Sequence, residues 1–202
     1  MKNLKLTFLF VAMFAVATVA QAQVALGVKA GVNASNFYGS ELNNNNAKIG
    51  FNAGISADYD FTYNVGIQTG LFATTKGFKY SQSELKYSDN LVYLQLPVHI
   101  AYKVDVTPGT RVFLHAGPYA AYGIAGKRSF SAGSFETSSN KVFGSGASQY
   151  KAFDAGLGIG AGVELGQLFF DLGWDAGLVN ISQASGGNVK NQNAYLSVGF
   201  KF

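Results

Sequence analysis

Nine charged side chains lie on segments in which apolar and polar residues alternate, and the chemistry open to them is charge pairing. Charges removed from water need partners, because an unpaired buried charge is strongly destabilising. We therefore predict a structural ion-pair network that plugs a common interior, with a proton or ion path as the alternative function. The residues assigned to this network are Lys29, Asp58, Lys103, Arg111, Asp154, Glu164, Asp171, Asp175 and Lys201.

Two histidines, His99 and His115, are the remaining candidates for chemistry. They could form a catalytic pair, a metal pair or part of a lipid-modifying hydrolase, but the sequence contains neither a nucleophile elbow nor metal-ligand spacing. The absence of Cys excludes disulfides, Cys-ligated zinc and thiol catalysis. We therefore expect no enzymatic activity and no cofactor, and interpret both histidines as hydrogen-bonded interior residues.

The composition indicates β-structure in a single domain. Of the 202 residues, 25 are Gly, 14% are aromatic and only 13% are charged, about half the share in soluble proteins. No Lys/Arg cluster has the character of a nucleic-acid footprint, so we expect no nucleic-acid partner.

The N-terminal segment, residues 1–22, has the features of a secretory signal peptide. Lys2 and Lys5 precede the apolar run from Leu6 to Val19, and Ala20 and Ala22 flank Gln21 in a small-x-small cleavage site. The run is shorter than the ~20 residues that a membrane-spanning helix needs, which argues against an anchor. We expect residues 23–202 to form the mature domain.

Eight segments of the mature chain alternate with period two, the period of a β-strand. Their connections alternate between long polar loops (34–47, 78–90, 127–150 and 181–193) and short turns near 60–63, 105–110 and 166–167. An even strand number with this alternation is typical of bacterial outer-membrane barrels. The segments are 24–33, 48–59, 64–77, 91–104, 111–126, 151–165, 168–180 and 194–202.

The composition of the two faces predicts which one meets lipid. One face is apolar along every segment, whereas the other carries Gly, Asn, Gln, Ser and nearly all of the charges. A lipocalin-like barrel would need the opposite arrangement, with its apolar face lining a ligand cavity. The alternating glycines Gly156, Gly158, Gly160 and Gly162 then make room inside for bulky residues, rather than cradling a phosphate. We predict an all-β, eight-stranded antiparallel up-and-down transmembrane barrel.

The chain resembles the PorT-like outer-membrane β-barrel family of Gram-negative bacteria in the Bacteroides group. The matching stretches are residues 27–33 (GVKAGVN), 93–98 (YLQLPV), 116–119 (AGPY) and 153–162 (FDAGLGIGAG), together with the terminal Phe202. The family position after Leu94 is often acidic, and here it is Gln95. The resemblance implies an eight-stranded barrel, and the founding member of the family is tied to a protein-secretion system.

These observations predict an integral outer-membrane monomer with periplasmic termini. Phe200 and Phe202 end the last strand with a pattern similar to the signal read by the outer-membrane assembly machinery. We expect a non-enzymatic role in envelope structure, or within a secretion or surface-assembly complex, with a protein partner bound through loops 34–47 and 127–150. The alternatives are a lipid-modifying barrel enzyme and a secreted lipocalin-like binder.

Overall fold

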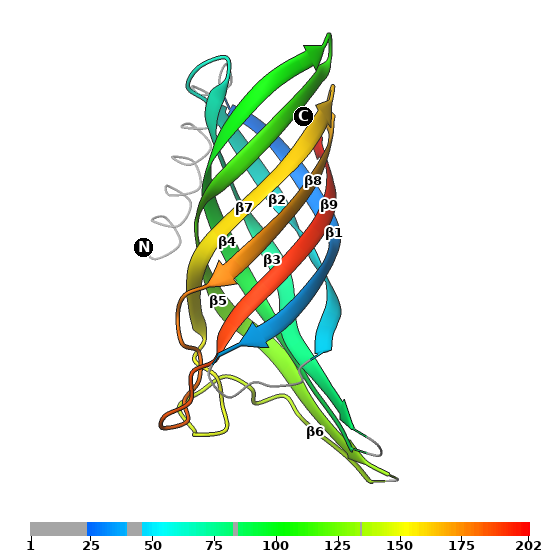
Figure 1. Cartoon of the computed structure of the whole chain (residues 1–202), viewed down its shortest axis with the longest axis vertical. Helices are drawn as coiled ribbons and strands as arrows, with labels where there is room; N and C mark the ends of the chain where they lie inside the picture. Colours follow the sequence, from blue (N-terminus) through cyan, green and yellow to red (C-terminus); the bar gives the residue numbers. More distant parts are fainter. Residues whose placement is uncertain (1–23, 40–45, 83–84, 134) are drawn as a thin grey trace, which may run out of the picture.

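The computed structural model describes residues 24–39, 46–82, 85–133 and 135–202, and it is built from β-strands (Figure 1). The strands are β1 (Val24–Tyr38), β2 (Asn46–Asp60), β3 (Val65–Gln82), β4 (Leu85–Thr107), β5 (Thr110–Ala132), β6 (Phe135–Ser139), β7 (Phe153–Leu165), β8 (Leu168–Gly177) and β9 (Lys190–Lys201). The expected signal peptide and its cleavage residues Ala20 and Ala22 lie outside the described residues.

Eight strands close into an antiparallel barrel, as the alternation predicted. Neighbours in the ring follow the chain, β9 pairs with β1 to close it, and β6 is attached to β5 outside the ring. Paired residues followed once around the ring from Tyr59 on β2 lead back to β2 at Ile49, a shift of 59 − 49 = 10 residues. With strands roughly 4.8 Å apart and a rise of roughly 3.3 Å per residue, this stagger inclines them by about 40° to the barrel axis.

Short turns join the strands at one end of the barrel, where β1 begins and β9 ends (Figure 1). Two of these turns need glycine, since Gly109 and Gly166 have φ values of 80° and 62°, a region that side chains with a Cβ rarely adopt. The longer connections lie at the opposite end. In outer-membrane barrels the short turns face the periplasm and the long loops face outward.

The apolar faces point away from the barrel axis and the polar faces point into it. Leu114, Ile100 and Ile55 are each more than 60% exposed, whereas Asp154, Lys103 and Asp175 are almost completely buried. This arrangement confirms the predicted direction of the two faces. No helix in the described segments has the length and apolarity needed to cross a membrane.

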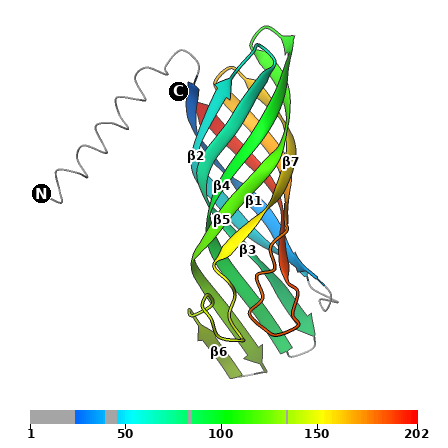
Figure 2. The ribbon, with the colours of Figure 1, turned by 90° about the vertical axis from the view of Figure 1, so that its left-hand side faces the viewer.

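The structure differs from the predicted loops at the long-connection end. Residues 78–90 form most of a hairpin between β3 and β4, and the segment 127–150 begins with the end of β5 and contains β6. Residues 76–82, 85–91, 126–132 and 135–139 together make a sheet that extends beyond the barrel wall, which we call the projecting sheet (Figure 2). The polar residues that suggested loops mark where the strands leave the apolar band, not where they end.

A hydrophobic cluster closes the barrel at the same end. Val142 follows β6 and Ile181 follows β8, and both side chains are buried against residues of the barrel wall. Phe143 and Val189 pack at the margin of the cluster. We call this group the loop-end cluster, and its buried members are Phe37, Leu91, Tyr93, Tyr119, Ala121, Val142 and Ile181.

Candidate functional site

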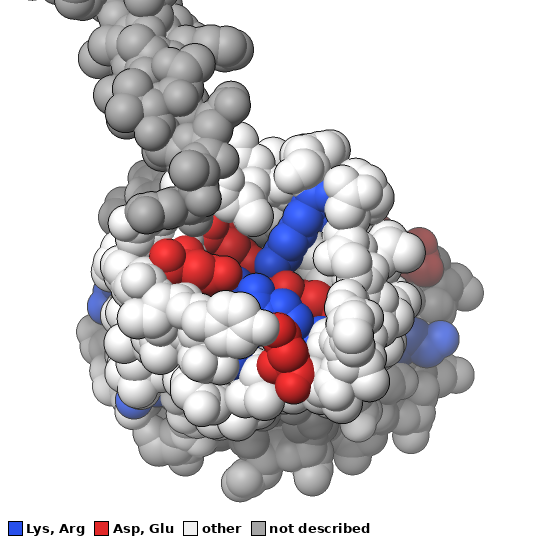
Figure 3. Space-filling view, turned by 90° about the horizontal axis from the view of Figure 1, so that it is seen from above, with Lys and Arg blue, Asp and Glu red and all other residues white. Residues whose placement is uncertain are grey.

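A layer of alternating charges fills the barrel at the short-turn end, as Figure 3 shows in the view into this mouth. Lys201 forms ion pairs with Asp58 and with Glu164, whose Oε1 lies 2.6 Å from its Nζ. Lys103 Nζ lies 3.6 Å from Asp58 Oδ2 and 3.9 Å from Glu164 Oε1, and 2.7 Å from Asp60 Oδ1. Four ring strands contribute these charges, so the layer links opposite walls of the barrel. We call it the mouth layer.

Arg111 lies at the rim, not inside the barrel as the network prediction placed it. Its Nε is 2.9 Å from Asp105 Oδ1, its Nη2 donates to the Tyr63 carbonyl at 2.7 Å, and Asp60 lies 3.6 Å from its Nη1. The parity of β5 does put Arg111 on the inward face. However, it is the second residue of β5, close to the turn at 108–109, where its long side chain is partly exposed to solvent.

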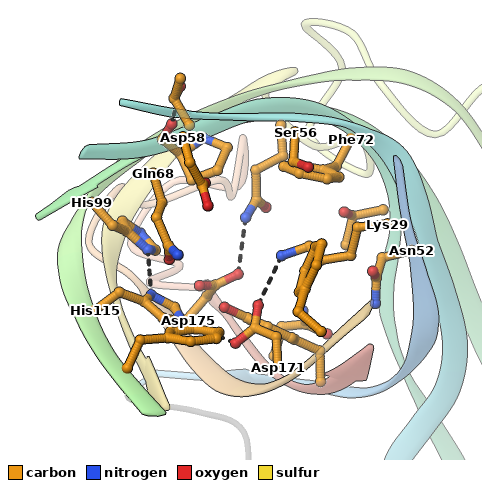
Figure 4. A pocket seen from close by; sticks show the side chains of 18 residues that line it. Lys29, Asn52, Ser56, Asp58, Gln68, Phe72, His99, His115, Asp171 and Asp175 are labelled. Carbon is orange, nitrogen blue, oxygen red and sulfur yellow. Dashed lines mark hydrogen bonds and ion pairs between the residues drawn. The ribbon is translucent and has the colours of Figure 1, made fainter. Parts of the chain in front are cut away.

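Deeper in the barrel, four side chains form a continuous chain of polar contacts (Figure 4). Lys29 Nζ donates to Asp171 Oδ2 at 2.9 Å, and Asp171 Oδ1 lies 2.9 Å from His115 Nε2. His115 Nδ1 in turn lies 2.8 Å from His99 Nδ1. If His115 is neutral and donates to the carboxylate, its Nδ1 must accept from His99 Nδ1–H. The contacts thus allow one consistent set of tautomers, as expected for hydrogen-bonded interior histidines.

A cavity of about 60 Å³ lies beside this chain. Asp175 lines it and accepts a 2.9 Å hydrogen bond from Gln95 Nε2, but no cation among the described residues forms an ion pair with this carboxylate. Gln95 Oε1, Asn52 Nδ2 and His99 Nε2 are buried and accept or donate no hydrogen bond to any residue that the structure describes. Charged, amide and aromatic side chains line the cavity, which is large enough to accommodate a few water molecules.

The next charged layer pairs Lys76 with Asp154, and neither side chain has exposed area. Asp154 Oδ2 accepts from Lys76 Nζ at 3.1 Å, from Asn191 Nδ2 at 2.9 Å and from the Tyr119 hydroxyl at 3.2 Å. The Lys76 ammonium also lies 4.4 Å from the centre of the Tyr119 ring. Sequence reasoning included Asp154 in the network but omitted Lys76, although period two puts Lys76 on the polar face of β3.

A further ion pair holds the projecting sheet together. Arg128 donates through Nε and Nη2 to both oxygens of Asp89, at 2.9 Å each, and the Tyr150 hydroxyl donates to Asp89 Oδ2 at 2.6 Å. The hydrogen bonds to Asp89 raise the pKa of Arg128. Burial, with a smaller contribution from Asp89, raises the pKa of Tyr87 to about 12. Sequence reasoning treated this region as a loop and therefore missed the pair.

Glycines on the inner face of β7 make room for rings on neighbouring strands. A Cβ on Gly162 would overlap the Phe113 ring, which is one of the bulky inward residues for which space was expected, and a Cβ on Gly160 would overlap the His115 imidazole. A Cβ on Gly158 would lie 2.8 Å from His99 Nε2. The histidines can therefore stack inside the barrel, with ring centroids 5.0 Å apart, because β7 offers no side chains at these positions.

The interior thus consists of stacked charge layers under an apolar cover. The mouth layer, the Lys29–Asp171 pair and the Lys76–Asp154 pair follow one another toward the loop-end cluster. Within the described segments, no group of three or more His, Cys, Asp or Glu side chains is placed to hold a metal ion. The arrangement can lock strands together and resist the passage of solutes.

Comparison with known proteins points to one family. The model of the family described as outer membrane protein beta-barrel domain matches residues 19–183. No curated protein is significantly similar to the chain in sequence.

Solved outer-membrane proteins show weak structural similarity to the chain. Superposition on OprG from Pseudomonas aeruginosa gives a TM-score of 0.49 at 10% identity, covering 89% of this chain and 96% of that one. Superposition on Neisserial surface protein A gives a TM-score of 0.47 at 15% identity, covering 88% of this chain and 97% of that one. Superposition on the attachment invasion locus protein Ail of Yersinia pestis gives a TM-score of 0.46 at 16% identity, covering 89% of this chain and 99% of that one.

Proposed function

The chain belongs to the outer membrane protein β-barrel domain family, and from that premise we propose that it is a closed, non-enzymatic membrane anchor of an envelope complex. As a member of this family it is an integral outer-membrane protein. The proposed complex acts in protein secretion or surface assembly, as the resemblance to PorT-like barrels implies. The projecting sheet and the segment 127–150 supply the surface for a protein partner.

The single observation that carries this proposal is the blocked interior. A pore would need a continuous aqueous path, but ion pairs cross the barrel at successive levels and the loop-end cluster covers them. Lys103 and Asp154 have almost no exposed side-chain area. A barrel that passes no solute contributes through its surfaces, which favours anchoring over transport.

The projecting sheet supports the partner surface. Strand β6 is exposed along its length and pairs only with β5 among the described strands, so one of its edges is available to another chain. Phe135 and Phe130 are exposed near this edge. Exposed loops and edges of a rigid barrel are common sites of protein contact.

Two experiments test the proposal. In planar bilayers the purified barrel should give no unitary conductance, and a steady pore current would refute the closed interior. In the organism, deletion of the gene should change the set of surface or secreted proteins. Complementation with wild type should restore that set, whereas a Phe130→Ser, Phe135→Ser double variant should not. A full rescue by this variant would refute the partner surface.

The two alternative functions have less support. A lipid-modifying enzyme would need its polar groups at the lipid face, whereas His99 and His115 are buried inside the barrel. A lipocalin-like binder would need an apolar lumen, whereas ion pairs and amide side chains cross this lumen between its aromatic residues. We also propose that Phe200 and Phe202, which lie at the short-turn end of β9, are read by the assembly machinery during insertion.

A further inference from the structure

The outward face of the projecting sheet carries three neighbouring lysines: Lys79 on β3, Lys86 on β4 and Lys127 on β5. All three are exposed. Lys79 pairs with Ser88, and Ser88 lies two residues from Lys86 along β4. Lys127 pairs with Asn90, which is two residues from Ser88 on the other side. Residues two apart along a strand share a face, so the three side chains emerge on the same side. We call this group the basic face.

Within the part of the chain that the structure describes, the charges of the basic face are not paired. Among the described residues, no acidic side chain forms an ion pair with any of the three lysines. Of the acids on the described strands, Glu136 on β6 is the nearest by register on this face, and Ser131 of β5 separates its position from that of Lys86. Asp89 points to the opposite face, where Arg128 binds it.

A fourth lysine increases the local positive charge. Lys48 lies on β2 just outside its apolar band. Its Nζ donates to Ser88 Oγ at 3.0 Å, and Ser88 is the β4 residue that pairs with Lys79 of the basic face. Burial and then the neighbouring Lys79 ammonium lower the pKa of Lys48, and Asp89 opposes this. A surface that binds an anion brings ammonium groups close together, and these groups repel one another until an anion is bound.

The position of the basic face relative to the membrane identifies the class of anion. On β4 the outward residues Ser88 and Asn90 follow Lys86 toward the barrel, and the next ones, Val92 and Leu94, are apolar. On β5 the apolar residues Ile124 and Tyr122 lie on the barrel side of Lys127, which is the lysine nearest the apolar band. The lysines therefore begin where the lipid-facing band ends, at the level of the outer-leaflet headgroups. Basic side chains at this level attract anionic headgroups, an interaction that falls off within a Debye length of the surface.

We propose that Lys79, Lys86 and Lys127 bind the phosphate groups of phosphorylated lipids in the outer leaflet. The three lysines lie on adjacent strands within a few register positions of one another, so one or two bound phosphates would bridge β3, β4 and β5. This contact fixes the projecting sheet relative to the membrane surface, and it is separate from the partner surface at the β6 edge.

The test uses the full-length barrel in detergent micelles, with bound lipid counted by native mass spectrometry. The probe is phosphatidic acid, whose headgroup is a phosphate monoester. Each lysine at an anionic surface contributes about fivefold in affinity, so Lys79→Gln, Lys86→Gln, Lys127→Gln should weaken binding roughly 100-fold. The matched control Lys141→Gln, Lys151→Gln, Lys190→Gln removes the same charge from the same end of the molecule and should change binding less than about threefold.

Two further arms distinguish the source of the phosphate. Phosphatidylcholine, which has no net charge, should not be retained, and inorganic phosphate should not displace phosphatidic acid at matched concentration. Equal losses in the two triple variants would overturn the proposal, because they would indicate general attraction to a basic end. Displacement by inorganic phosphate would also overturn it, in favour of a free-anion site. Altered mobility of unheated samples on SDS gels confirms that each variant is folded.

Discussion

Breaking the Lys76–Asp154 pair should be among the most damaging single changes in the barrel interior. Both side chains are fully buried, and Asp154 keeps only the neutral donors Asn191 and Tyr119 if the ammonium is removed. Removing one partner of such a pair leaves an uncompensated buried charge and costs about 3–5 kcal/mol. We expect this loss for Lys76→Met and for Asp154→Asn.

The double variant separates the charge effect from a loss of shape. Lys76→Met with Asp154→Asn removes both charges at nearly constant volume, so its stability should lie within about 1 kcal/mol of wild type. The two single losses would then be strongly non-additive. As a control, Lys141→Met changes an exposed lysine and should alter the free energy of unfolding by less than about 0.5 kcal/mol.

The stability of each variant can be measured by following the fluorescence of Trp174 during unfolding in guanidinium chloride. This residue is the only Trp of the chain and lies on the outward face, so its fluorescence reports the transfer from lipid to water on unfolding. With an m-value of about 3 kcal/mol/M in guanidinium chloride, a loss of about 4 kcal/mol lowers the unfolding midpoint by roughly 1.3 M. Midpoints of the single variants within about 0.3 M of wild type, or additive losses in the double variant, would refute the reasoning.

Three further outcomes are expected. Gly160→Ala should destabilise the barrel by about 1–3 kcal/mol in the same assay, because its Cβ overlaps His115; an unchanged midpoint would show that the imidazole moves freely. Arg111→Ala should cost less than about 1 kcal/mol, since its ion pairs lie at the solvated rim, and a larger shift would place it in the interior network. The raised pKa of Tyr87, about 12 instead of 10, favours the folded state at neutral pH. The unfolded state ionises first as the pH rises, so hydrogen exchange of the projecting sheet should accelerate between about pH 10 and 12. Phenolate absorbance should show the late titration, and a normal midpoint would contradict it.

The barrel could be predicted from sequence because period two is a local property. Each segment such as 48–59 carries its apolar and polar faces explicitly, and the direction of those faces follows from composition alone. Barrel closure, the antiparallel order and the short turns at 166–167 follow from the same pattern. The alternating glycines of β7 also predicted space for bulky inward residues, and the Phe113 ring occupies part of it.

The charge partners were harder to predict because they depend on register and depth. Asp154 on β7 forms its ion pair with Lys76 on β3, across the interior of the barrel. A local sequence pattern does not predict which residues meet across the interior. Arg111 has the parity of an interior residue but lies too close to a turn. The projecting sheet was not predicted because the segments that form it are rich in polar residues. A loop and a strand that extends above the membrane both have this composition, and only the pairing of the strands distinguishes them.

The pairing of β1 with β9 has a consequence for how the chain assembles. It joins residues such as Val28 and Phe200 that are far apart in sequence, whereas the other ring contacts join strands close along the chain. Closing so long a loop costs more conformational entropy than forming a hairpin, so we expect this junction to form last. Before the junction forms, β1 and β9 each have an unpaired edge. The ion pair between Lys29 on β1 and Asp171 on β8 cannot form until β9 holds these two strands in the same wall. The topology therefore leads us to expect that the hairpins form first and that the junction beside the C-terminal aromatic residues forms in the final step.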